Sequence, residues 1–97
     1  MRKRNTESLG EVLRQFFEEN QFFKRKFAES RVISGWSKLF GASINTYTTN
    51  LYLKNGTLFV HLSSSVLRAE LMMAKEQLIK NLNQHAGMDV VKEIIFK

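Results

Sequence analysis

The pattern of apolar and polar residues is clearest between Thr49 and Leu62, where it predicts a β-hairpin. Two alternating runs, residues 49–54 and 57–62, are separated by Asn55 and Gly56. An Asn-Gly pair favours a type I′ turn, because both central residues of that turn need a positive φ. The turn sets the register of the two strands and predicts these cross-strand pairs: Lys54 with Thr57, Leu53 with Leu58, Tyr52 with Phe59, Leu51 with Val60, and Asn50 with His61. One face of the hairpin is therefore aliphatic, and the other is formed by Tyr52, Phe59 and His61.

Apolar residues at helical spacing precede the hairpin. Between residues 8 and 19 they recur at i, i+3, i+4, i+7 and i+8, which predicts one amphipathic helix whose stripe consists of Leu9, Val12, Leu13, Phe16 and Phe17. Ser8 and Glu11 have the spacing of a capping box at its start, although Asn5 or Thr6 is an alternative cap.

A second apolar series runs from Phe22 to Phe40 after an interruption at residues 20–21. Its phase is imperfect, so it predicts either two short helices with a break near Ser30 or one bent helix. Gly41 suits the end of this region. The polar, β-branched residues 42–48 are predicted to form a loop that leads into the hairpin.

The region after the hairpin predicts one long helix and a third strand. Residues 63–65 are serines that offer hydroxyl caps, and a core stripe follows at Leu67, Leu71, Ala74, Leu78 and Leu82. Gly87 is expected to end the helix, and residues 90–96 are rich in branched side chains that favour a strand. A strand, one crossover helix and another strand make the third strand parallel to the second. The sequence therefore predicts an α+β fold in the order α-α-β-β-α-β, with a small mixed three-stranded sheet packed on helices.

Length and composition limit the classes of protein. A chain of 97 residues with 43% hydrophobic residues and no proline fits one domain over residues 6–97, preceded by a flexible basic arm at residues 1–5. The absence of cysteine excludes disulfides, cysteine-bound zinc and thiol catalysis, and two isolated histidines argue against another metal site, so no cofactor is expected. No apolar run reaches the length of a signal peptide or a membrane span. We expect a cytoplasmic protein with no membrane partner.

The net charge of +6 and the pI near 9.9 favour a polyanionic partner. The residues expected to contact phosphates are the arm Arg2, Lys3 and Arg4, the triplet Lys24, Arg25 and Lys26, and as extensions Arg31, Lys38 and Lys54. Consecutive helical residues point about 100° apart, so the triplet cannot face one partner as a whole. The alternative for both basic groups is a solvated surface that favours solubility.

The aromatic residues allow two interpretations. Tyr52, Phe59 and His61 are a candidate platform for stacking bases. Alternatively, the same face is covered by the phenylalanines of the first two helical regions, in the core or by self-association, because a buried phenylalanine stabilises by about 1.5–3 kcal/mol. The spacing of Trp36 with Leu39 and Phe40 predicts a core anchor.

Catalytic groups are not arranged for chemistry along the sequence. His61 and His85 are on different predicted elements, and no glycine-rich phosphate loop is present. The serines at 63–65 suit helix capping better than nucleophilic attack, which needs flanking glycines in a nucleophile elbow. The sequence therefore does not predict an enzyme.

An ordered set of short motifs spans most of the chain: Trp36-x-x-Leu39-Phe40-Gly41, then Leu51-x-x-x-x-Gly56-x-Leu58-x-Val60-x-Leu62-x-Ser64-Ser65-x-Leu67-x-x-Glu70-Leu71, then Leu82-Asn83, then Ile94-x-Phe96. This succession resembles the DciA-like family, long catalogued as a domain of unknown function, whose fold is similar to a KH domain. The resemblance implies a non-enzymatic accessory of bacterial DNA replication that helps to load the replicative helicase onto single-stranded DNA and contacts both. KH modules grip the nucleic-acid backbone with a Gly-x-x-Gly loop. The five glycines here do not make that spacing, so any nucleic acid must be held by other basic groups.

Three functions follow from these patterns. The first is a nucleic-acid-binding accessory of DNA replication, with single-stranded DNA and the replicative helicase as partners. The second is a protein-interaction or self-association module that binds no nucleic acid. The third is an RNA-binding, KH-like module.

Overall fold

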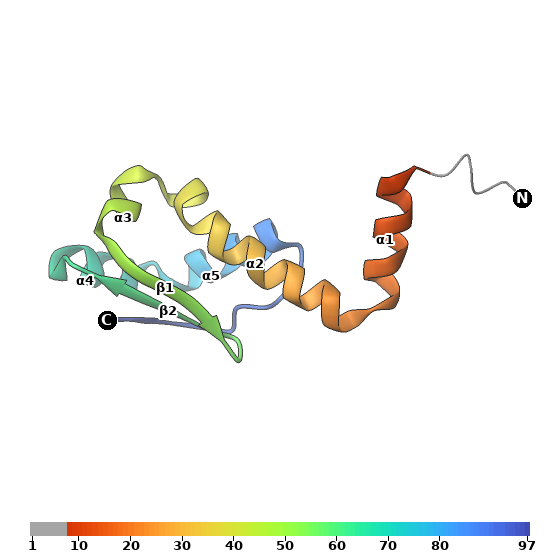
Figure 1. Ribbon diagram of the computed structural model, residues 1–97. Helices are drawn as coiled ribbons and strands as arrows, with labels where there is room; N and C mark the ends of the chain where they lie inside the picture. The colour runs from red at the N-terminus through yellow and green to blue at the C-terminus, as the bar shows by residue number, and fades with distance from the viewer. Residues whose placement is uncertain (1–7) are drawn as a thin grey trace, which may run out of the picture.

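The computed structural model describes residues 8–97. In chain order its elements are α1 (Leu9–Glu19), α2 (Gln21–Phe40), α3 (Ala42–Tyr47), β1 (Thr48–Lys54), β2 (Thr57–Leu62), α4 (Ser65–Met73), α5 (Lys75–Ala86) and β3 (Glu93–Phe96). The predicted basic arm at residues 1–5 and the alternative caps at residues 5–6 lie outside the described residues. The fold is α+β with a three-stranded mixed sheet, as the sequence predicted, and it is consistent with the KH-like fold that the family resemblance implies (Figure 1).

The sheet has the strand order β1-β2-β3 and confirms the predicted hairpin. All five predicted cross-strand pairs between β1 and β2 are present. The register of the two strands shifts between Asn50 and Thr48, and Thr48 pairs with Leu62. Asn55 has a φ of 51° and Gly56 a φ of 83°, as a type I′ turn requires. β3 runs parallel to β2, which confirms the crossover prediction.

The first two helices resolve the alternatives left open by the sequence. The hydroxyl of Ser8 accepts a hydrogen bond from the Glu11 N–H (3.1 Å), so Ser8 caps α1. Asn20 separates the helices, and its side chain accepts from the Phe23 N–H (3.3 Å) to cap α2. α2 is one continuous helix of 20 residues, without a break near Ser30. Gly41, with a φ of 95°, ends it as predicted.

Three predicted elements differ in detail. The loop predicted at residues 42–48 is wrong, because residues 42–47 form the short helix α3, in which the Thr46 hydroxyl donates to the Ala42 carbonyl (2.9 Å). The single helix predicted after the hairpin is also wrong, because it breaks at Ala74 into α4 and α5. The third strand begins at Glu93 and not at Val90.

The side chain of Asn83 explains the shorter third strand. Its oxygen accepts hydrogen bonds from the backbone N–H groups of Val90 (3.1 Å) and Val91 (2.9 Å), and its amide donates to the Val91 carbonyl (3.0 Å). These bonds hold the backbone of both valines against α5, so it cannot pair with β2. Both valine side chains are nevertheless fully buried in the core.

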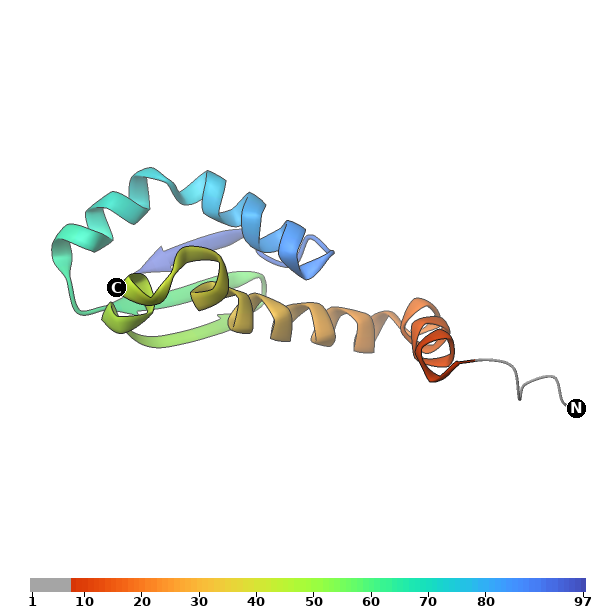
Figure 2. The same cartoon turned by 90° about the horizontal axis from the view of Figure 1, so that it is seen from above.

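The core lies between the aliphatic face of the sheet and two helices. Leu58, Val60 and Ile94 are fully buried, whereas Leu51 and Leu53 at the edge strand are half-buried. Two helices share the cover of this face, with α2 against β1 and α5 against β3 (Figure 2).

Trp36 is buried, as predicted, and anchors α2 in this core. It is 1% exposed, and its indole N–H donates to the Thr48 hydroxyl (3.0 Å), which in turn donates to the Ile44 carbonyl (2.7 Å). Its ring meets Phe40 edge to face, with the ring centroids 5.0 Å apart. The tryptophan therefore links α2 with α3 and the start of β1.

The helices α2 and α5 approach each other closely at Gly35. A Cβ atom on this residue would lie 2.5 Å from Cδ2 of His85, so the histidine ring fills the space that a larger residue would need. Gly35 is buried, and His85 is half-buried. The close approach of these two residues determines how near the two helices can lie.

The molecule is elongated, with principal extents of 61 × 24 × 20 Å. Its radius of gyration is 16.7 Å, whereas a compact domain of about 100 residues has about 13 Å. We call residues 28–97 the body and residues 8–27, which comprise α1 and the start of α2, the helical arm. The helical arm projects away from the sheet (Figures 1 and 2).

Candidate nucleic-acid interface

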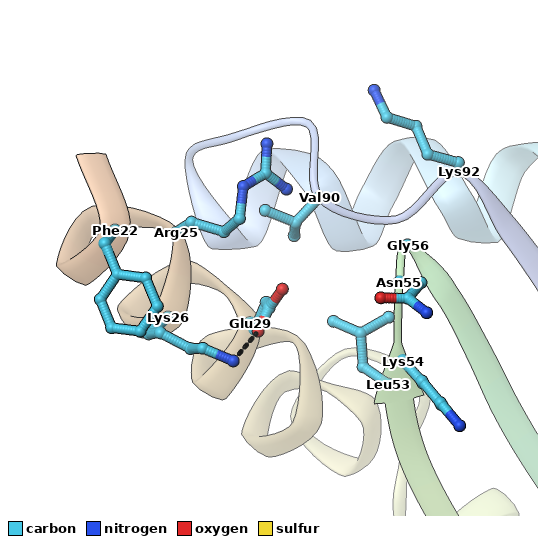
Figure 3. Close-up of a pocket in the computed structure, with 10 residues that line it drawn as sticks. All are labelled: Phe22, Arg25, Lys26, Glu29, Leu53, Lys54, Asn55, Gly56, Val90 and Lys92. Carbon is cyan, nitrogen blue, oxygen red and sulfur yellow. Dashed lines mark ion pairs between the residues drawn. The ribbon is translucent and has the colours of Figure 1, made fainter.

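A basic cleft of about 520 Å³ lies where the helical arm meets the body. Three segments that are distant in the sequence form it: the start of α2, the turn between β1 and β2, and the segment before β3. Its lining includes four cationic side chains, Arg25, Lys26, Lys54 and Lys92, and one carboxylate, Glu29 (Figure 3). Phe22, Leu53 and Val90 provide apolar surface between them.

Backbone hydrogen bonds fix the two body segments of the basic cleft. The Gly56 carbonyl accepts from the N–H groups of Lys92 (2.7 Å) and Glu93 (3.2 Å). A Cβ on Gly56 would lie 3.1 Å from Cγ of Lys92, so the lysine stem passes close over the glycine. The hairpin turn and the segment before β3 therefore place Lys54 and Lys92 on either side of one turn, with their ammonium groups pointing outward (Figure 3).

The start of α2 contributes the opposite wall. Arg25 and Glu29 are in helical phase with the buried residues Ala28 and Val32, so they face the body and not the solvent behind the helix. In Figure 3 the Arg25 side chain extends toward Val90. The cations of α2 and the two lysines beside the turn thus lie on opposite sides of the cleft.

The only acidic group that lines the cleft does not neutralise it. Glu29 pairs with Lys26 at a distance of 3.7 Å between Oε1 and Nζ, and the Lys26 side chain is 62% exposed. Lys26 also lies 5.7 Å from the centre of the Phe22 ring. Among residues 8–97, Arg25, Lys54 and Lys92 form no ion pair, and such a concentration of positive charge in a cleft attracts phosphate groups.

The structure brings together some of the predicted phosphate contacts and separates others. Arg25, Lys26 and Lys54 line the basic cleft, whereas Lys24, Arg31 and Lys38 do not. The guanidinium of Arg31 lies 5.9 Å from the centre of the Phe27 ring. Arg2, Lys3 and Arg4, which belong to the predicted basic arm at residues 1–5, lie outside the described residues.

Sequence reasoning missed Lys92. The predicted strand over residues 90–96 makes this lysine an ordinary exposed position. The available signal was Asn83, seven residues before Val90, because an asparagine after a core position of a helix can hold a following loop through its side chain. Held in this way, the segment before β3 meets the hairpin turn.

The second candidate, the face with Tyr52, Phe59 and His61, is on the open side of the sheet. Tyr52 and Phe59 stack with ring centroids 4.9 Å apart and an interplanar angle of 17°, and His61 lies 6.0 Å from Tyr52. Lys97 Nζ lies 5.5 Å from the centre of the Phe59 ring. Phe59 therefore already contacts Tyr52 and Lys97, and Tyr52, which is 39% exposed, is the more accessible ring.

The four phenylalanines of the helical arm whose burial is described are not buried on this face. Phe16, Phe22, Phe23 and Phe27 are 45–63% exposed, so the prediction of a core packed between them and the sheet is wrong. The physical reason is that the helical arm extends past the sheet and not across it (Figure 2). Self-association through these side chains remains a prediction.

An ion pair fixes the start of β3 next to the basic cleft. The pKa of Glu93 is lowered because its carboxylate accepts a hydrogen bond from the Ile94 N–H (2.9 Å) and, second, one from Lys75, whose Nζ lies 3.1 Å away. Lys75 is the first residue of α5, so the pair links the helix break to the sheet.

The junction between α4 and α5, at Ala74, contains no glycine, whereas KH modules carry a Gly-x-x-Gly loop between two helices.

Among residues 8–97, no helix combines the length and the apolar character that crossing a membrane requires.

No curated protein matches the chain in a sequence comparison. A family model described as "Dna[CI] antecedent, DciA" matches residues 8–96, which is nearly the whole chain. The chain therefore belongs to the DciA family, and this membership implies a role in DNA replication related to the loading of the replicative helicase.

Proposed function

We propose that this protein is a non-enzymatic accessory of DNA replication that holds single-stranded DNA in the basic cleft and contacts the replicative helicase. One observation supports the DNA site above all others. Arg25, Lys26, Lys54 and Lys92 come from three separate segments and line one cleft together with a single carboxylate. A surface that is basic only for solubility does not need to gather its charges in this way.

Electrostatic contact with phosphates explains the binding. Each cation that neutralises a phosphate releases a counterion, so affinity falls as the salt concentration rises. For a single strand, four phosphate contacts predict a slope of about −3 in a plot of log K against log salt concentration. A pure protein-interaction module predicts no binding to the strand, even at low salt.

The apolar part of the cleft suits the bases of a single strand. Phe22 is 63% exposed beside Arg25 and Lys26, and stacking of one base on an aromatic ring contributes about 1–3 kcal/mol. In a duplex the bases are already stacked on one another and are not free to reach this ring. The cleft therefore favours single strands over duplexes.

The test is fluorescence anisotropy with a labelled single strand, titrated at several salt concentrations. We expect the charge reversals Arg25→Glu and Lys92→Glu each to weaken binding about tenfold and to reduce the salt slope. Lys38→Glu is the matched control, since it makes the same charge change in α2 outside the cleft. Equal losses for all three variants would mean that net charge, and not the cleft, determines binding.

Single-stranded RNA and duplex DNA of the same sequence are further arms of this titration. Tighter binding of RNA than of DNA would favour the alternative of an RNA-binding, KH-like module. A pull-down with the replicative helicase tests the second partner. The same pull-down with the Arg25→Glu and Lys92→Glu variants shows whether the helicase and DNA use different surfaces.

The second candidate function is a protein-interaction module. The exposed apolar residues of the helical arm favour it, because they offer no group that recognises phosphate. It is distinguished by retained helicase binding in a protein that binds none of the three nucleic acids at low salt.

A further inference from the structure

The helical arm exposes a continuous set of large apolar side chains. The exposed fractions are 74% for Leu9, 46% for Val12, Leu13 and Phe16, 45% for Phe23 and 52% for Phe27. Every side chain of α1 whose burial is described is exposed. We call these six residues the arm face.

The side chains of the arm face remain partly exposed although some of them contact one another. The rings of Phe16 and Phe23 meet at 5.3 Å and join α1 to α2, yet each remains nearly half exposed. A helix of 11 residues such as α1 is only marginally stable without tertiary packing. Its clear amphipathic pattern therefore indicates that another surface covers it in the functional protein.

The arm face points away from both the core and the basic cleft. Phe23 and Phe27 lie on the side of α2 opposite Ala28 and Val32, which pack in the core. Phe22, which lines the basic cleft, lies between these two sides. A partner on the arm face therefore does not have to displace a strand from the cleft.

The charges around the arm face are self-complementary. On α1, helical phase places Glu19 beside the apolar stripe, whereas Glu11 and Glu18 lie on the opposite side of the helix. On α2, Lys24 and Arg31 lie beside Phe23 and Phe27, whereas Arg25 faces the body and Lys26 lines the basic cleft. A carboxylate beside the stripe of one helix and two cations beside the stripe of the other match the same two helices of a second copy turned by a twofold axis.

We infer that the arm face binds the arm face of a second copy of this chain. In this dimer, α1 of each copy packs on the start of α2 of the other, and the two helical arms form an antiparallel four-helix bundle. The six residues expose roughly 600 Å² per copy, and the charged side chains around them bring the buried surface close to the roughly 800 Å² per partner of a stable interface. The two bodies, each with its basic cleft, then lie at opposite ends of the bundle.

The first experiment measures the mass of the full chain by light scattering and by sedimentation, over a series of concentrations. We expect a dimer of twice the 11.3 kDa chain mass that dissociates on dilution. The double variant Phe23→Ser and Phe27→Ser should be monomeric at concentrations where the unchanged protein is dimeric. A protein that stays monomeric up to about 1 mM overturns the inference, since even a weak interface forms there.

The matched control replaces apolar residues that are even more exposed but belong to the body. Val66 and Met73 on α4 are 70% and 86% exposed, and the variant Val66→Ser with Met73→Ser should remain a dimer. If the control variant is monomeric and the variant Phe23→Ser with Phe27→Ser is still a dimer, the interface lies elsewhere and the inference is overturned.

A charge exchange tests the pairing of α1 with α2 without removing any apolar residue. One variant carries Glu19→Lys, and the other carries Lys24→Glu and Arg31→Glu. Each alone should dimerise less well, because like charges then meet across the interface, whereas a mixture of the two should form the heterodimer. A mixture that is no more dimeric than its components would contradict the proposed arrangement, whether or not DNA binding is present.

Discussion

The body and the helical arm both contain large aromatic side chains, but they place them in opposite environments. In the body, Trp36 is 1% exposed and donates a hydrogen bond to Thr48. In the helical arm, the four phenylalanines whose burial is described are 45–63% exposed. The body therefore folds on its own core, whereas the helical arm displays apolar surface, which suggests that it functions by contact with another surface.

The largest expected effect is a difference between one core residue and one arm residue. Trp36→Ala should lower the free energy of unfolding by about 3–5 kcal/mol, because it leaves a cavity and removes the hydrogen bond to Thr48. Phe23→Ala should change it by less than about 0.5 kcal/mol in dilute solution, where no partner covers the ring. Urea unfolding followed by circular dichroism measures both. Similar losses for the two variants would mean that the helical arm belongs to the cooperative core.

The next largest effect concerns a polar group of the body. Asn83→Ala should destabilise by about 2–3 kcal/mol, since the N–H groups of Val90 and Val91 and the Val91 carbonyl would lose their partner. Asn81→Ala is the control, because Asn81 accepts only an exposed hydrogen bond from Gln77. The same unfolding measurement applies, and a neutral Asn83→Ala would show that water replaces the side chain at no cost.

The crossing of α2 and α5 gives a smaller effect and a test by rescue. Gly35→Ala should cost about 1–3 kcal/mol, because the new Cβ overlaps the His85 ring. His85→Ala should reduce that cost in the double variant, since it removes the ring. A double-mutant cycle in urea gives the coupling energy. Additive effects of the two changes would indicate that the glycine is required for another reason.

The basic cleft lies between the two regions and receives cations from both. Replacing one cation by a neutral residue, as in Lys92→Gln from the body or Arg25→Gln from the start of α2, should weaken single-strand binding by about 1 kcal/mol and lower the salt slope by about 0.7. Anisotropy titrations at several salt concentrations measure both quantities. A change of slope for only one of the two would show that the strand contacts one wall of the cleft and not both.

The sequence predicts the body better than the places where its segments meet. The Asn55-Gly56 turn and the period of two fix the hairpin register locally, and the crossover rule fixes the direction of β3. The break at Ala74 was not predictable in this way, because the apolar stripe continues through it; the Ala74 N–H instead bonds to the Leu71 carbonyl three residues back. The position of Lys92 depends on Asn83, through hydrogen bonds between residues that no periodicity relates.

The candidate cleft residues could be predicted as charges but not as a group. Net charge and the triplet at residues 24–26 indicated a polyanionic partner, and helical phase showed that the triplet must divide. Which members face the body depends on the buried side of α2, and this requires knowing that Ala28 and Val32 pack in the core. The exposure of the phenylalanines in the helical arm could not be predicted either, because an apolar stripe at helical spacing also fits a buried helix.

The smallest predicted effect compares the ion pairs of the two regions. In the helical arm, Glu11 and Arg14 pair within one helix at 3.7 Å, whereas Lys75 and Glu93 in the body join α5 to β3 at 3.1 Å. The pKa of Glu93 lies below its ordinary value of 4.5 in the folded chain, chiefly because of its hydrogen bond from Ile94 and then because of Lys75. Its contribution to stability is therefore present above pH 4.5 and is lost as the pH falls through the lowered folded pKa. Glu93→Gln should remove part of the acid dependence of unfolding in this range, and Glu11→Gln should not, because a pair within an exposed helix does not hold the body together. Urea unfolding at a series of pH values measures the difference, and identical acid profiles for the two variants would place the acid sensitivity elsewhere than at the link between α5 and β3.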